Sequence, residues 1–119
     1  MDFSQSRISY IKSSIKRSYF ACYSANEILF DDKELSNASN EIKAAAYINQ
    51  AISIIESCKA LYYSRIEELE NAEVEHIFNK FDNLSNEFLN NFSTFHSHQW
   101  SNIEFENFKD AVNAFIELP

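Results

Sequence analysis

The chain contains no glycine among its 119 residues. Glycine is the usual residue where a backbone turns left-handed or approaches a ligand closely. Its absence excludes glycine-rich phosphate loops, dinucleotide-binding turns and the serine elbow of α/β-hydrolases, all of which need glycine at fixed positions. It also removes the Asn-Gly and Asp-Gly turns that favour tight β-hairpins. We therefore expect an all-α protein whose helices are separated by short breaks rich in Asn and Ser.

Hydrophobic residues make up 45% of the chain and aromatic residues 15%, which is enough to form one core in a single domain of this length. Eighteen acidic residues against ten basic residues give a net charge of −8. Because binding to duplex nucleic acid depends on cations that neutralise phosphates, we expect no direct nucleic-acid binding. The negative charge suits docking on a basic protein, and it also favours solubility without any partner.

The longest uncharged apolar stretch, residues 44–55, is too short and too polar to span a bilayer. The first residues lack the continuous apolar segment of a secretory signal. In a helical hairpin, Cys22 and Cys58 are expected to lie roughly 15 Å apart along the axis, which is too far for a disulfide. We therefore expect free thiols, no membrane segment and a cytoplasmic protein.

Apolar residues spaced three and four apart predict about four helices, and short connections predict a single-domain antiparallel helical bundle over 1–119. We expect the helices at 4–30, at 40–70 after a loop over 35–40, from Asn71 onward, and at 103–118. Ser39 is the expected N-cap of the second helix, with Glu41 in its first turn. The expected core positions of the other three helices are Ile8, Ile11, Ile15, Tyr19, Cys22 and Leu29, then Phe78, Phe81, Ser85, Phe88, Phe92 and Phe95, then Phe108, Val112 and Phe115.

The second helix carries two apolar stripes. The first comprises Ile42, Ala45, Ile48, Ile52, Ile55, Tyr62, Ile66 and Leu69, and the second comprises Ala44, Tyr47, Ala51, Ile54, Cys58 and Leu61. A helix that is apolar over most of its circumference must be covered on most sides. We therefore expect it either at the centre of the monomer or shared between two subunits of a homodimer. Residues 66–78 either continue this helix or contain a break, after which Asn71 caps a new helix.

The sequence offers few groups for catalysis or metal binding. Glu73 and His76 form a single Glu-x-x-His pair, whereas di-iron bundles use this pair on two helices. His96 and His98 are expected in a turn near Trp100, since residues two apart on a helix point in different directions. Burial on apolar stripes raises the pKa of a thiol and lowers its reactivity. We therefore expect no catalytic residue, no metal ligand and no cofactor, and a metal-dependent oxidase or a degenerate ribonuclease is the least favoured alternative.

Residues 44–61, AAAYINQAISIIESCKAL, resemble the second helix of HEPN domains in their alanine and glutamine content. The ribonuclease members of that family carry an Arg and a His a few residues apart. Here ten residues separate Arg65 from His76. The chain is therefore not assigned to the HEPN family.

The strongest candidate for a binding surface is an acidic segment that follows two tyrosines. It comprises Tyr62 and Tyr63, and then Glu67, Glu68, Glu70, Glu73 and Glu75. Tyrosine is favoured at interface hot spots, and complementary charge speeds association. The leading hypothesis is a small non-catalytic binding protein of the inhibitor or immunity type that occupies a basic protein surface, for example on a nuclease or a nucleic-acid-handling complex. The alternative is a homo-oligomeric structural or adaptor module that shares its second helix.

Overall fold

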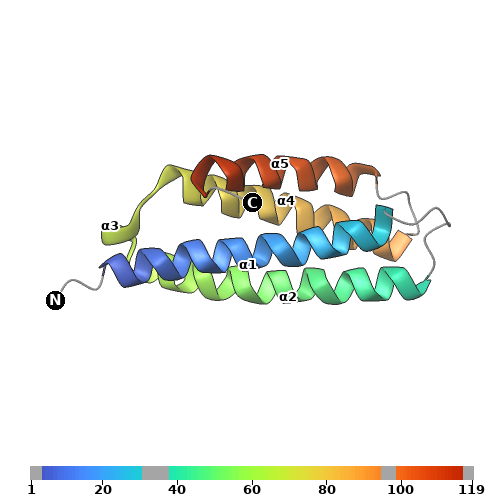
Figure 1. Ribbon diagram of the computed structural model, residues 1–119, viewed down its shortest axis with the longest axis horizontal. Coiled ribbons are helices and arrows are strands. Elements are labelled where there is room, and N and C mark those ends of the chain that lie inside the picture. The colour runs from blue at the N-terminus through green and yellow to red at the C-terminus, as the bar shows by residue number, and fades with distance from the viewer. Residues whose placement is uncertain (1–3, 31–37, 95–98, 117–119) are drawn as a thin grey trace.

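The computed structural model describes residues 4–30, 38–94 and 99–116, and these form helices only. They are α1 (Ser4–Phe30), α2 (Ala38–Ser64), the single turn α3 (Ile66–Leu69), α4 (Ala72–Thr94) and α5 (Gln99–Phe115). The four long helices run back and forth along an axis of 54 Å, against 26 and 19 Å in the other directions (Figure 1). The predicted all-α antiparallel bundle is confirmed.

Two helical hairpins make up the bundle. α1 lies along α2, and α4 lies along α5, with each pair antiparallel (Figure 1). The hairpins meet where α1 contacts α5 and where α2 contacts α4. The short α3 contacts both α1 and α2 at the end of the bundle where the chain crosses from one hairpin to the other.

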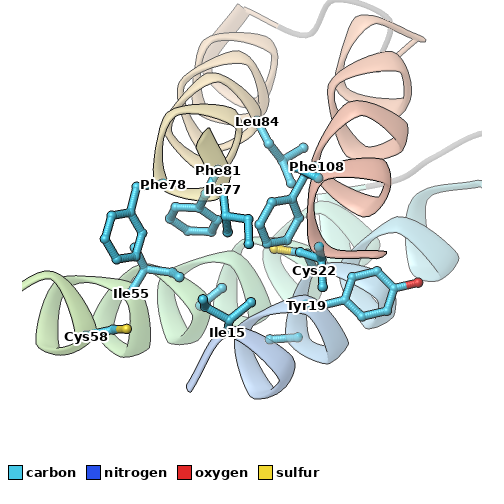
Figure 2. Packing of buried hydrophobic residues seen from close by; sticks show 14 of the residues in the cluster. Ile15, Tyr19, Cys22, Ile55, Cys58, Ile77, Phe78, Phe81, Leu84 and Phe108 are labelled. Carbon is cyan, nitrogen blue, oxygen red and sulfur yellow. The ribbon is translucent and has the colours of Figure 1, made fainter. Parts of the chain in front are cut away.

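Both hairpins contribute bulky side chains to one core, and α1 and α2 add many small ones. The buried bulky residues of α1 and α2 are Ile11, Ile15, Tyr19, Ile48, Ile55 and Tyr62, and the buried small ones are Ser14, Ser18, Ala21, Cys22, Ala25, Ala44, Ala51 and Cys58. The buried side chains of α4 and α5 include Phe78, Phe81, Phe88, Phe105 and Phe108. Figure 2 shows the labelled side chains of α4 and α5 pointing toward those of α1 and α2. Interdigitation of large and small side chains fills the space between the two hairpins.

Aromatic contacts join α5 to both hairpins. The Phe108 ring lies 5.6 Å from the Phe81 ring of α4, edge to face, and the Phe105 ring stacks on Tyr19 of α1 at 5.9 Å. Such pairs contribute about 0.5–1.5 kcal/mol beyond the area they bury. α5 is therefore held from two sides, although it is the shortest of the four long helices.

Most of the expected core positions in the described side chains are buried, and Ile8 and Phe115 pack at the edge of the core. The pattern missed Ile77 and Phe105, which are both buried. Cys22 and Cys58 are free and buried, as predicted. The side chains of Leu29, Phe92 and Trp100, and all of Phe95, His96 and His98, lie outside the described residues.

The predicted extent of the second helix was wrong at its end. α2 ends at Ser64 instead of Glu70, and Arg65 leaves the helical conformation with φ −128° and ψ 37°. A second interruption, at Glu70 and Asn71, separates α3 from α4, and its physical reason is the apolar phase of the segment. Leu69 and Val74 are both buried, but residues five apart on one helix point about 140° away from each other. The break lets both side chains reach the core.

Of the two arrangements expected for the second helix, the central position in the monomer is wrong. Its buried apolar side chains come from both expected stripes and are Ala44, Ile48, Ala51, Ile55, Cys58 and Tyr62, while Ile42 is 63% exposed and Tyr47 is 39% exposed. α1 covers α2 along its length, whereas α4 contacts it less extensively. α2 is therefore an outer helix of the bundle and not its central one.

The other helix boundaries differ by a few residues. α2 begins at Ala38, so Ser39 lies within the first turn instead of at the N-cap, while Glu41 occupies the first turn as expected. α5 begins at Gln99, before the predicted start, and ends at Phe115. No helix in the described ranges has the length and hydrophobicity that crossing a bilayer requires.

Two alanines of α2 test how tightly the hairpins are packed. Ala51 has no exposed surface, whereas Ala46 is exposed. Extra methylenes in a filled core cost about 1–3 kcal/mol, so we expect Ala51→Leu to lower the free energy of unfolding by this amount in urea denaturation. Ala46→Leu is the matched control and should change it by less than about 0.5 kcal/mol. Equal effects of the two substitutions would contradict this packing.

Candidate functional site

The acidic segment lies at the corner where α2, α3 and α4 meet. Asn71 caps α4, because its Oδ1 accepts hydrogen bonds from the backbone N–H groups of Glu73 at 2.8 Å and Val74 at 3.2 Å. Glu73 and Glu75 occupy the first turn of the helix, where negative side chains interact favourably with the helix dipole. Of the two arrangements that the sequence left open, the break with Asn71 as the cap is the one observed.

Tyr62 fastens the end of α2 to the start of α4. Its hydroxyl accepts a hydrogen bond from the backbone N–H of Asn71 at 2.9 Å and donates one to Oε2 of Glu75 at 2.7 Å. The Asn71 carbonyl lies 3.3 Å from the same hydroxyl. Burial and the hydrogen bond to Glu75 raise the pKa of Tyr62 to about 12, because both disfavour the phenolate.

The placement of Tyr62 corrects its expected role. It was expected to contact a partner, but it has no exposed surface. Its ring meets the Phe78 ring edge to face at 5.5 Å, and its hydroxyl satisfies polar groups at the break. Tyr62 therefore positions the acidic corner from inside the protein, while its neighbour Tyr63 remains on the surface with 53% exposure.

An ion pair ties the corner to the first helix. Arg7 donates from Nε to Oε2 of Glu68 at 2.7 Å and from Nη2 to Oε1 at 2.5 Å. This two-point geometry is the strong form of an arginine–carboxylate pair. It joins the start of α1 to α3, whose Leu69 is buried beneath. The charge of Glu68 is consequently matched within the protein.

The remaining carboxylates of the segment face solvent. Glu67, Glu70, Glu73 and Glu75 are all exposed, and Arg65 is exposed beside them. Arg65, Arg7 and Glu67 line a surface hollow on one side of α3, so charges of both signs are present there. Glu70 and Glu75 line a different hollow on the side of α4, and this side of the corner is the more acidic one.

The second hollow is a groove of about 690 Å³ between the end of α2 and the beginning of α4. Tyr63 forms one wall, with its ring 5.0 Å from Tyr62 and 6.3 Å from Phe78. His76 also lines the groove. At the far end Lys59 contacts Oδ1 and Oδ2 of Asp82 at 2.9 and 3.0 Å. Partial burial lowers the pKa of Lys59, but the hydrogen bond and charge of Asp82 outweigh it and raise this pKa above its usual value.

The groups considered for catalysis or metal binding are not brought together. Glu73 and His76 both face solvent, and within residues 4–30, 38–94 and 99–116 no three His, Cys, Asp or Glu side chains are grouped so as to hold a metal ion. Burial raises the pKa of the Cys58 thiol to about 11 and also raises that of Cys22. Thiols of this kind are poor nucleophiles at neutral pH.

Comparison with protein-family models, with curated proteins and with solved structures found no match to this chain. Sequence reasoning missed the Arg7–Glu68 and Lys59–Asp82 pairs, whose members are 61 and 23 residues apart. No local spacing reveals such pairs. The one usable signal was the step in apolar phase after Leu69, which marked the corner.

The hydroxyl of Tyr62 gives a test of how the corner is held. Removing one partner of a buried hydrogen bond costs about 1–3 kcal/mol, so we expect Tyr62→Phe to lower the free energy of unfolding by this amount at neutral pH. Because the pKa rises from 10.0 to about 12 on folding, the contribution of the hydroxyl is complete below pH 10 and is lost as the pH rises through about 12. Urea denaturation of both proteins should show their difference shrinking over this range.

Tyr63→Phe is the matched control, because it removes a hydroxyl from an exposed neighbour and should change the stability by less than about 0.5 kcal/mol. A difference between wild type and Tyr62→Phe that stays constant up to pH 12 would show that Tyr62 does not titrate as its surroundings require.

Proposed function

We propose that this protein is a small non-catalytic binding protein of the inhibitor or immunity type, whose acidic corner docks on a basic surface of another protein. The observation that carries the proposal is the exposure of Glu67, Glu70, Glu73 and Glu75 along α3 and the first turn of α4. A nuclease or a nucleic-acid-handling complex is the kind of partner that offers such a basic surface.

The rigidity of the corner supports this proposal. The Asn71 cap, the Tyr62 hydroxyl and the Arg7–Glu68 pair each fix the backbone that carries the acidic side chains. A surface that is already ordered loses less conformational entropy on binding than a disordered acidic tail would lose. Fixed carboxylates also steer a basic partner during the encounter, which raises the association rate.

The cysteines support a cytoplasmic location. Both thiols are free and buried, which fits a reducing environment. The proposal therefore has the protein act on its partner in the cytoplasm. The buried thiols and their raised pKa values also fit a protein that works by binding.

A pair of charge-reversed variants tests the electrostatic docking. The first carries Glu67→Lys, Glu70→Lys and Glu73→Lys, and the matched control carries Glu27→Lys, Glu106→Lys and Asp110→Lys at exposed sites elsewhere. Both change the net charge equally. Each protein is immobilised and used for affinity capture from its native host, and the association rate of the captured partner is then measured.

We expect the first variant to lose the partner or to bind it at least about tenfold more slowly, and the control to retain it. Binding to wild type should also weaken strongly at about 0.5 M salt, because screening shortens the reach of exposed charges. A partner that both variants retain equally, or that ignores salt, would contradict the proposal. Failure to capture any protein whose binding differs between the two variants would contradict the proposal as well.

A second candidate function is a homo-oligomeric structural or adaptor module. It is favoured by two exposed apolar side chains of α2, Ile42 and Tyr47, and by the absence of any charged residue over 44–55. Exposed apolar side chains on an uncharged stretch of helix are typical of surfaces that become covered.

Sedimentation equilibrium tests the second candidate. A homodimer formed through α2 should dissociate when Tyr47→Lys places a charge in the interface, whereas Tyr10→Lys, at an exposed tyrosine of α1, should leave it intact. A wild-type protein that remains a monomer at high micromolar concentration would rule out this candidate.

A further inference from the structure

The groove beside the acidic corner already holds one cation of the protein itself. Lys59 places its Nζ 5.8 Å from the centre of the Phe78 ring, 2.9 Å from Asp82 and 3.6 Å from Glu56. An aromatic face combined with carboxylates is the usual environment of a bound ammonium or guanidinium group. The far end of the groove therefore shows which chemistry its walls accommodate.

The near end of the same groove, which is lined by Tyr63, Glu70 and Glu75, has the same combination of an aromatic ring and carboxylates. Tyr63 supplies an exposed aromatic ring, and Glu70 and Glu75 supply two carboxylates. Among the described residues, no Lys or Arg forms an ion pair with Glu70 or Glu75. Oε2 of Glu75 is held by the Tyr62 hydroxyl, so the carboxylate is fixed in place before any partner arrives.

We propose that the near end of the groove binds the guanidinium group of an arginine side chain from the partner. The guanidinium would lie against the Tyr63 ring and be paired with Glu70 and Glu75. This inference rests on the proposed function, because it names the partner group that the acidic corner receives. It also goes further, since it assigns a specific ring and two specific carboxylates to that group.

Arginine fits this end of the groove better than lysine for geometric reasons. A guanidinium is planar, stacks on an aromatic face and donates two parallel hydrogen bonds to a carboxylate. An ammonium is a compact point charge that is more strongly hydrated. Because Tyr63, Glu70 and Glu75 line the same groove, a planar cation suits both the aromatic ring and the carboxylates.

The probe for this inference is N-acetyl-arginine N-methylamide, titrated into the whole protein and followed by NMR. The lysine analogue serves as a probe with a different cation, and the alanine analogue serves as a probe with no side-chain charge. We expect the arginine probe to shift the ring signals of Tyr63 and the backbone amide of Glu70, and to bind at least about threefold more tightly than the lysine probe.

Tyr63→Leu keeps apolar bulk but removes the aromatic face, and it should weaken the arginine probe by about threefold and abolish its preference over lysine. Tyr10→Leu, at an exposed tyrosine of α1, is the matched control and should bind both probes as wild type does. Glu70→Gln should weaken both cationic probes. Unchanged amide spectra away from the substitutions show that each variant is folded.

Equal shifts from the arginine and lysine probes, shifts confined to other parts of the surface, or a Tyr63→Leu protein that binds like wild type would overturn the inference. Such a result leaves the proposed function standing if the captured partner still distinguishes the two charge-reversed variants. The probe titration does not depend on the captured partner. A partner that fails to distinguish the charge-reversed variants therefore counts against the proposed function and not against the arginine site.

Discussion

The buried hydroxyl of Tyr62 connects the two halves of this protein at the point where the chain changes direction. It bonds to the backbone N–H of Asn71 and to the carboxylate of Glu75, and it thereby satisfies polar groups that the interruption of a helix leaves without partners. Because α2 stops at Ser64 and α4 restarts at Ala72, the acidic side chains between them project from a corner and not along one straight rod. The groove, the exposed Tyr63 and the fixed carboxylate of Glu75 all depend on this junction.

Apolar packing and ion pairs stabilise the bundle in different ways. The core combines isoleucines, tyrosines and small residues of α1 and α2 with phenylalanines of α4 and α5, and its stability comes mainly from apolar burial. The ion pairs are few among the described residues and lie near the surface, where each contributes little on its own. Their positions matter more than their energies. Arg7 fixes α3 to α1, and Lys59 holds α2 to α4 beside the groove.

Much of the fold could be predicted from the sequence because it follows from local spacing. The extent of α1 was predicted to the residue, and Ile11, Ile15, Phe81 and Phe108 were expected in the core and are buried. The site was predicted less completely. Its acidic residues were recognised, but Tyr62 was expected both on a covered apolar stripe and at the binding surface, because a tyrosine has the same local pattern whether its hydroxyl meets solvent or a buried amide. The pairing of Glu68 with Arg7 was also missed, since it joins residues 61 positions apart.

The sequence alone therefore determined that the chain is helical, where its first helix lies, which faces are apolar and that it lacks the glycine-dependent phosphate and nucleotide sites. These properties depend on side-chain type and on a period of about 3.6 residues, which are visible in any short window. The tertiary structure decided that α2 is an outer helix, that Tyr62 is internal while Tyr63 is exposed, and that Glu70 and Glu75 face one groove. Those outcomes depend on which helices contact each other and at which position along the bundle axis. Only the packing of distant segments determines these contacts.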